Sequence, residues 1–379
     1  MANALFVADL ARLHAGEDWY GLPQLRRTAY FPLYGSILGE YVLNFGDTAH
    51  GRLLAAPTLR LAAEYRDPVL QWYAEQGSTD DVLSLLWWDP ELESSPPSGL
   101  EISVAYPGGV EWAVLRSSLT DPDAVVVGLR GGTTTASHCH RDLQSIIVHA
   151  LGEPLIADHG NLGYSRDYWV SQYGHLGRDT RAHNTLLPEG LEQVQRRTIP
   201  TMVEGEDLRC SSRIIVLVRQ ADSDYVASEA VLTYGEGDGG RRVMVCHDRH
   251  MALVRPGLLL LVDEVSCGEP LELGWSFHAG GDVELRGDGA CFRSGVARLD
   301  FRAHGGARLS LTRRDDQKLP YLFLESAARV SKALFVATLL PYRVGEEPAA
   351  PEVTVRGKDV ELSWRGSRHR LRVASRRWE

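Results

Sequence analysis

Hydrophobic positions along the first ninety residues recur at spacings of three and four, and then change to short apolar runs. Four early segments follow the helical spacing and are separated by Gly, Pro and Asp: 4–14, 34–45, 51–65 and 68–76. The segment DPELESSPPSG (89–99) ends this pattern with three prolines, three serines and a glycine, which is typical of a linker. We therefore predict a helical region over residues 1–90 and a linker over 91–99.

Beyond residue 100 the apolar runs are short, rich in β-branched and aromatic residues, and bounded by turn-forming residues. Examples are EISVAY (101–106), AVVVGLRGG (124–132), LLLLVDEV (258–265) and LELGWSFHA (271–279). Many short strands without intervening helices favour antiparallel sheets packed as a sandwich. The predicted fold class is α+β, with a short helical region followed by a large antiparallel β-sandwich over 100–379.

Composition excludes several classes of protein. The formal net charge of −10 and the pI near 5.7 argue against a nucleic-acid partner, because neutralising phosphates needs clustered Lys and Arg. No apolar stretch of about 18 residues occurs, so we expect no membrane span. Five widely spaced cysteines without a CxxC pair do not indicate a disulfide framework. The first residues, MANALFVADL, lack the basic start of a signal peptide, and the cellular location is not predicted.

Candidate chemistry begins at SHCHRD (137–142), just before an apolar run. If this segment is a strand, alternate side chains share a face, which groups His138, His140 and Asp142 and turns Cys139 away from them. The following run, SIIVHALGEPLIAD (145–158), is expected to fold back at 150–154 as a hairpin-like pair. This fold would bring Asp158 opposite the histidines.

A third element, TRAHNTLL (180–187), adds His183. Together His140, Asp158 and His183 offer two imidazoles and a carboxylate, which suits Zn²⁺ with one position left for water. Asp142 is then a natural acceptor for an imidazole N–H. The alternative is a polar turn without metal, because most single histidines are hydrogen-bonded or exposed residues and the chain has thirteen. We interpret His149, His159 and His175 as surface or structural residues.

The segment between Asp158 and His183 is rich in Gly, Tyr and Arg and shows little periodicity, which is unusual unless a loop binds something. Its aromatic rings suit the faces of sugars, and its arginines suit a carboxylate or a sulfate. The alternative is that these side chains pack the loop onto the sandwich. The residues in question are Tyr164, Tyr168, Trp169, Tyr173, Arg178 and Arg181.

These elements in combination resemble the C-terminal region of the heparinase II/III-like polysaccharide lyases. The shared pattern is HxHxD (138–142), an apolar strand ending in Asp-x-Gly (158–160), a loop containing tyrosine, and His-Asn (183–184). The later strand LGWSFHAGG (273–281) is also similar, and the resemblance covers roughly residues 20–290. The segment from Ala29 to Arg52, which includes NFGD (44–47), resembles the end of the α/α toroid that precedes the sandwich in the family.

The resemblance implies a lyase that cleaves an acidic, uronate-containing polysaccharide by β-elimination. It implies a zinc ion that organises the site rather than activating water, and a histidine that faces the substrate. The implied roles are metal binding for His140, Asp158 and His183, catalysis for His138 with Tyr164, Tyr168 or Tyr173, and substrate binding for Arg178, Arg181 and Asn184.

Two other functions stay open from the sequence. Only about ninety helical residues precede the linker, so most of a toroid is missing from this sequence. A non-catalytic carbohydrate-binding or structural protein could keep the metal site without it, and a metal-dependent hydrolase could use water on zinc as nucleophile. The remaining toroid helices would need a cover, which favours a homodimer. The particular polysaccharide is not predicted.

Overall fold

The computed structural model describes most of the chain, in two compact units. Its described residues are 2–37, 41–48, 51, 53–135, 138–161, 177–194, 210–235, 240–305 and 309–379. The first unit comprises Met1–Leu43, His50–Ile102 and Ser118–Pro122, and the second comprises Asn44–Ala49, Ser103–Ser117 and Asp123–Glu379. The short segment 44–49 therefore belongs to the second unit although the chain around it belongs to the first.

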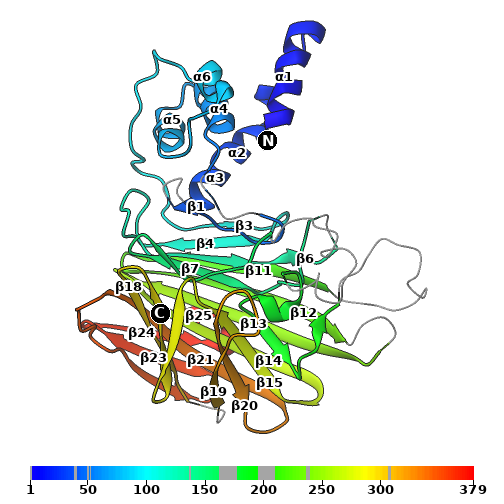
Figure 1. The fold of residues 1–379 in the computed structure, drawn as a ribbon, viewed down its shortest axis with the longest axis vertical. Helices are drawn as coiled ribbons and strands as arrows, with labels where there is room; N and C mark the ends of the chain where they lie inside the picture. The colour runs from blue at the N-terminus through cyan, green and yellow to red at the C-terminus, as the bar shows by residue number, and fades with distance from the viewer. Residues whose placement is uncertain are drawn as a thin grey trace. The chain divides into compact units, whose positions relative to one another are not determined.

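The first unit holds the α-helices, drawn in blue to cyan in Figure 1. They are α1 (Ala2–Ala15), α2 (Pro23–Ala29), α3 (Phe31–Tyr34), α4 (Ala56–Tyr65), α5 (Pro68–Glu75) and α6 (Val82–Trp87), with the 3₁₀ turn η1 (Trp19–Gly21). The start of α5 shows why the sequence forms helices here. The Asp67 carboxylate accepts from the backbone N–H groups of Val69 and Leu70, and Pro68 takes the first helical position.

The helix predicted over 34–45 is wrong. α3 ends at Tyr34, and the antiparallel pair β1 (Ser36–Ile37) and β2 (Tyr41–Val42) follows. Glycine at position 35 and the β-branched and aromatic residues after it favour this extended pair over a helix.

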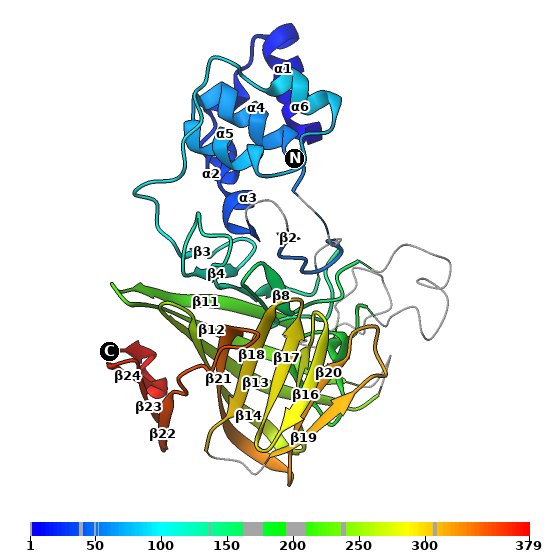
Figure 2. The same ribbon diagram turned by 60° about the vertical axis from the view of Figure 1, so that its left-hand side comes forward.

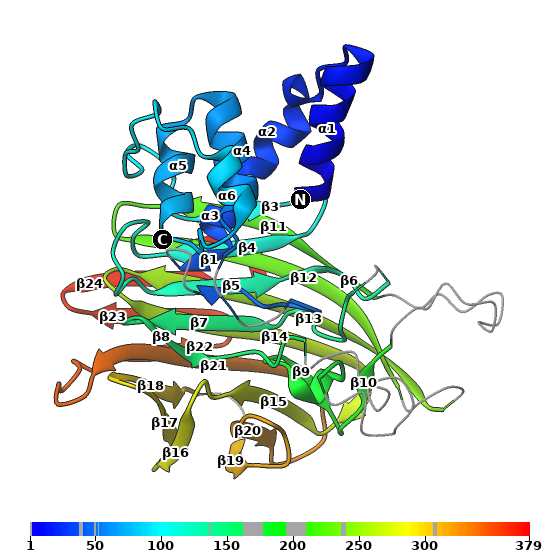
Figure 3. The ribbon, with the colours of Figure 1, turned by 45° about the horizontal axis from the view of Figure 1, so that its top comes forward.

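The second unit is a large antiparallel assembly of sheets. One sheet is five-stranded: β3 (Val104–Tyr106), β4 (Trp112–Arg116), β5 (Val126–Arg130), β7 (Ile146–Ala150) and β8 (Glu153–Ile156). A four-stranded sheet follows the order β19 (Leu309–Arg314), β20 (Tyr321–Ser326), β15 (Leu273–His278) and β9 (Leu186–Pro188). Figure 3 shows β5, β7 and β8 side by side.

The ten-stranded sheet forms the centre of this unit. Its order is β16 (Asp282–Arg286), β17 (Gly289–Ser294), β18 (Ala297–Ala303), β21 (Val330–Arg343), β14 (Leu258–Leu271), β13 (Arg242–Val254), β12 (Ser223–Gly235), β11 (Cys210–Arg219) and β6 (Gly132–Thr133), and β10 (Glu192–Gln193) also pairs with β12. A last sheet contains β22 (Glu352–Arg356), β23 (Asp359–Trp364), β24 (Ser367–Arg372) and β25 (Arg377–Trp378). The second unit also contains the 3₁₀ turns η2 (Thr180–Ala182) and η3 (Val373–Ser375).

The run LLLLV in β14 explains the layering. Leu259 and Leu261 point into the core shared with the five-stranded sheet and with β15 and β20, whereas Leu258 and Leu260 point into the core shared with β23 and β24. A strand buried on both faces is continuously apolar. Figure 2 shows β22, β23 and β24 on one side of the central strands and β19 and β20 on the other. The predicted fold class, a short helical region followed by a large antiparallel β-sandwich, is confirmed.

Within the described residues, no helix has the length and apolar character needed to cross a membrane. None of the five cysteines forms a disulfide bond in the structure.

Candidate active site

Asp47 contacts both histidines of the HxH pattern. One carboxylate oxygen, Oδ2, lies 2.8 Å from Nδ1 of His138, and the other, Oδ1, lies 2.8 Å from Nε2 of His140. The His138 side chain is 68% exposed and the His140 side chain 1% exposed. One acidic residue therefore holds an imidazole at the surface and a second imidazole in the interior.

The strand predicted for SHCHRD is wrong. Residues 138–142 form a turn and bend, and His138 has a φ of 63°, which is in the left-handed region. The histidines meet through this turn and through Asp47, not through the alternation of a strand. Asp47 N donates to His138 O at 3.1 Å, and a Cβ on Gly46 would lie 2.7 Å from that oxygen.

The segment 44–48 also contacts the chain after β8. Asn44 Nδ2 donates to Asp158 O at 3.0 Å, and Asn161 N donates to Thr48 O at 3.1 Å. Asn44 and Asp47 were missed as site residues by sequence reasoning. The available signal was the polar NFGD turn, which carries a glycine and an acid at the end of the helical region.

The predicted hairpin is confirmed, because β7 and β8 pair antiparallel around the turn at 151–152. It brings Asp158 to His183, with Oδ2 2.7 Å from Nδ1 and both side chains fully buried. The other oxygen of Asp158 accepts from Gly160 N at 2.9 Å. The ring of His140 lies 5.3 Å from that of His183, centroid to centroid. The three predicted metal ligands therefore lie together.

Burial and charge set the protonation of these groups. Burial lowers the pKa of His140, and His183 lowers it further. Burial alone would lower the pKa of His183 and raise that of Asp158, but their mutual attraction outweighs burial and shifts both pKa values the other way. Asp158 is thus an anion and His140 a neutral ring, the forms that a metal needs, whereas His183 would release a proton on binding one.

A zinc ion fits the donor chemistry of this cluster. Nδ1 of His140 and Nε2 of His183 are buried and find no hydrogen-bond partner in the described residues, which is costly for polar atoms unless something binds them. A carboxylate oxygen can accept a hydrogen bond and still ligate, so the contact with His183 leaves Asp158 able to bind. Among the described residues, however, no group of three or more His, Cys, Asp or Glu side chains is arranged so that it could hold a metal ion.

Asp142 does not accept from an imidazole N–H as predicted. Its Oδ2 lies 2.8 Å from Nε of Arg130, an ion pair without the alignment of a hydrogen bond, and both side chains are buried. This carboxylate still acts on the histidines by its charge, which raises the pKa of His140 and His183 against burial. The reason for the misplacement is the turn at His138, which removes the strand alternation.

Asn184 was predicted to bind substrate, but its side chain is fully buried and engaged within the sandwich. Nδ2 donates to Ile146 O at 2.7 Å and to Ala157 O at 2.8 Å, and Oδ1 accepts from His278 N at 2.7 Å. This amide therefore ties the ends of β7, β8 and β15 together beside His183. We revise its role to that of a residue that holds the site in place.

The arginines and tyrosines of the loop are only partly described. Arg181 is 45% exposed, and its Nε lies 3.1 Å from Glu192 Oε1. The side chain of Arg178 is half-buried, and its backbone oxygen accepts from Arg141 N at 3.0 Å. The predicted catalytic tyrosines lie outside the described residues: Tyr164, Tyr168 and Tyr173. Their roles, and substrate binding by Arg178 and Arg181, stay predictions.

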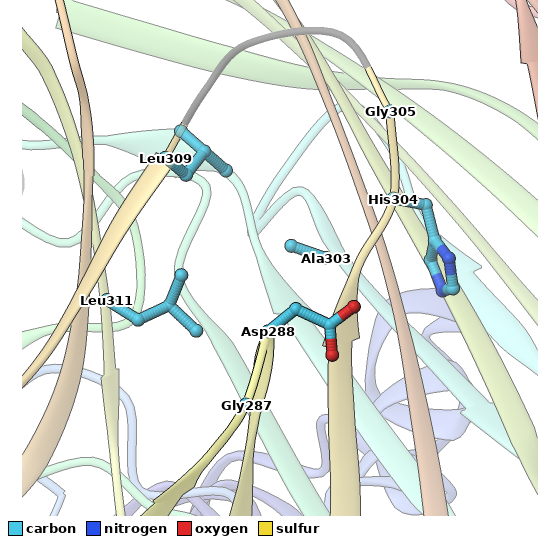
Figure 4. Close-up of a pocket in the computed structure, with 7 residues that line it drawn as sticks. All are labelled: Gly287, Asp288, Ala303, His304, Gly305, Leu309 and Leu311. Carbon is cyan, nitrogen blue, oxygen red and sulfur yellow. The ribbon is translucent and has the colours of Figure 1, made fainter.

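A cavity of about 330 Å³ lies elsewhere in the sandwich, between the β16–β17 turn, the end of β18 and β19. Figure 4 shows Leu309 and Leu311 of β19 on one side of it and Ala303 and His304 on the other. None of the residues that line it is a predicted site residue. We therefore locate the candidate active site at the histidine cluster and not at this cavity.

Comparison with known protein families identifies the class to which the chain belongs. The profile of the family "Heparinase II/III-like, C-terminal" matches residues 109–330, which is more than half of the chain. The chain belongs to this family. No curated protein sequence gives a significant match.

Solved structures share the fold. A heparinase III with methylated lysines superposes with a TM-score of 0.73 at 14% identity over 97% of this chain and 54% of that one. Heparan sulfate lyase HepC from Pedobacter heparinus gives a TM-score of 0.67 at 17% identity over 89% and 50%. A further heparinase III gives 0.70 at 15% identity over 97% and 57%. The chain thus spans about half the length of these similar structures.

Proposed function

We propose that this protein is a polysaccharide lyase that cleaves a uronate-containing polysaccharide by β-elimination. The observation that carries the proposal is the imidazole of His138, 68% exposed and fixed by Asp47 at 2.8 Å beside a buried histidine–carboxylate cluster. Membership of the heparinase II/III-like family over 109–330 supports it.

β-Elimination removes the proton on C5 of the uronate and expels the sugar linked through the 4-oxygen. That proton is acidic enough only when hydrogen bonds or positive charge neutralise the neighbouring carboxylate. His138 lies at the surface, where its imidazole can neutralise the carboxylate or move the proton. A tyrosine of the loop, Tyr164, Tyr168 or Tyr173, would protonate the leaving oxygen.

The proposal includes a zinc ion held by His140, Asp158 and His183. Zinc would supply a fixed positive charge that orders the side chains of the site. Activation of a water molecule by the metal is not needed, because β-elimination consumes no water. The buried nitrogens His140 Nδ1 and His183 Nε2, for which the described part of the chain supplies no hydrogen-bond partner, support this assignment. In this proposal His140, Asp158 and His183 hold the zinc ion, and His138 contacts the substrate.

The reaction leaves a 4,5-unsaturated uronate, which absorbs in the ultraviolet. We expect incubation with heparan sulfate, hyaluronan, alginate or glucuronan to raise this absorbance, and His138→Ala to abolish the rise. The matched control is His14→Ala, because His14 is an exposed histidine on α1.

Other outcomes select other functions. New reducing ends without the absorbance would reject a lyase and indicate a metal-dependent hydrolase. Glycan binding without either product would indicate a carbohydrate-binding or structural protein.

A further inference from the structure

We infer that Asp47 is a positioning residue that fixes the tautomers of His138 and His140 in opposite senses and so links the catalytic histidine to the metal site. The inference rests on the proposed function for its kinetic consequence, but not for its structural content. It starts from the two contacts of 2.8 Å, in which each carboxylate oxygen meets one ring nitrogen.

The chemistry of a carboxylate determines both tautomers. An ionised carboxylate only accepts hydrogen bonds, so each facing nitrogen must carry the proton. The proton of His138 is then on Nδ1, and the lone pair of the neutral ring is on Nε2. In His140 the proton is on Nε2, and the lone pair is on Nδ1, which is buried and has no hydrogen-bond partner among the described residues. The carboxylate of Asp47 thus places the lone pair of His138 on Nε2 and the lone pair of His140 on the buried Nδ1.

The position of Asp47 is itself fixed by the fold. Its backbone N–H donates to His138 O, and Gly46 approaches that same oxygen too closely for any larger residue. Asn44, three residues earlier, donates to Asp158 O. The turn 44–48 therefore contacts both the histidine segment and the backbone of Asp158, the residue whose carboxylate pairs with His183. A change in this turn would reach both halves of the site.

Such an arrangement has a mechanistic consequence. A carboxylate behind an imidazole holds the ring in the tautomer and orientation needed for proton transfer, and loss of the carboxylate lowers the rate through the wrong tautomer. A carboxylate behind a metal-binding histidine has the same effect on the ligand. Asp47 acts on both rings, so the two functions are coupled through one residue.

The test is Asp47→Asn, which keeps the shape of the side chain but offers one acceptor and one donor. The two rings then cannot both keep their wild-type protons, and we expect one of them to change tautomer in long-range ¹H–¹⁵N spectra of ¹⁵N-histidine-labelled protein. Spectra of His138→Gln and His140→Gln assign the signals. Asp282→Asn is the matched control, because Asp282 pairs with Arg293 and Arg313 on the surface of the sandwich.

Kinetics and metal content give independent readouts. We expect Asp47→Asn to lower kcat by about 10²-fold with little change in KM, and to weaken zinc binding by about 10-fold or more. Unchanged tautomers of both rings in Asp47→Asn would overturn the inference. If the wild-type protein shows no lyase activity but the tautomer changes, the proposed function fails and the assignment of Asp47 stands.

Discussion

Arg249 forms a bidentate ion pair with Asp263 in the centre of the sandwich. Nε lies 2.8 Å from Oδ1 and Nη2 lies 2.7 Å from Oδ2, and both side chains are fully buried. Nη1 of the same guanidinium donates to Asn184 O at 3.0 Å and to Gln144 O. Arg249 and Asp263 are 14 residues apart in the chain and lie on the neighbouring strands β13 and β14. Through the contact with Asn184 O, the pair supports the backbone beside His183.

Removing one member of this pair should destabilise the protein strongly. Arg249→Ala leaves Asp263 as a buried charge without its cation, and we expect a loss of about 3–5 kcal/mol in the free energy of unfolding. Urea unfolding followed by circular dichroism measures it. The surface pair of Arg286 and Glu284 is the control, because Arg286→Ala should cost less than about 1 kcal/mol. A loss below about 1 kcal/mol for Arg249→Ala would contradict the assignment.

Asn184→Ala should destabilise the junction of β7, β8 and β15. The substitution leaves the oxygens of Ile146 and Ala157 and the N–H of His278 without their partner in the interior. We expect a loss of about 3 kcal/mol in the free energy of unfolding, since an unsatisfied buried group costs about 1–3 kcal/mol. Asn3→Ala on the exposed side of α1 should change it by less than about 0.5 kcal/mol. Equal stabilities would show that the amide is not a structural tie.

Metal content tests the proposed zinc site directly. We expect the purified protein to contain about one zinc per chain by mass spectrometry, and both His140→Ala and His183→Ala to lose it. Each of these histidines supplies a buried nitrogen that has no other partner in the described part of the chain. His304→Ala should keep the metal, since His304 lies outside the cluster and its Nε2 is 2.7 Å from Thr338 Oγ1. Unchanged zinc content in His140→Ala would mean that the metal binds elsewhere.

A pH dependence of stability should arise from His250, on the side of β13 that faces the C-terminal sheet. Burial lowers the pKa of His250 from 6.5 to about 4. The unfolded chain therefore takes up a proton before the folded protein does, and stability falls as the pH drops from 6.5 to about 4. A shift of this size corresponds to about 3 kcal/mol.

Unfolding at several pH values measures this effect. His250→Phe should remove this part of the pH dependence. Tyr225→Phe should keep it, because the tyrosine hydroxyl contacts His250 Nδ1 at 2.7 Å but burial is the main cause of the shift. An unchanged slope in His250→Phe would assign the pH dependence to other groups.

The sequence by itself determined the parts of the protein that depend on local pattern. The apolar run LLLLVDEV at 258–265 predicted a strand of the sandwich, and β14 covers it. The apolar run at 145–158 predicted the hairpin that carries Asp158. The side-chain chemistry of His140 and His183, which suits a metal, grouped these two histidines with Asp158, and the structure places them near one another. Apolar runs and donor chemistry are properties of the residues themselves, so they could be inferred without a structure.

Only the tertiary structure decided how the site is completed. Asp47 meets His138 and His140 across 91 and 93 residues of chain, and no local pattern determines a contact over that separation. His138 has a positive φ, so this segment forms a turn and not the expected strand. Asp142 therefore pairs with Arg130 and not with an imidazole. Asn184, which was predicted to bind substrate, is buried, and its side chain is hydrogen-bonded to backbone groups. Each of these outcomes depends on which backbone groups the packed sheets bring together, because buried polar atoms must find partners there.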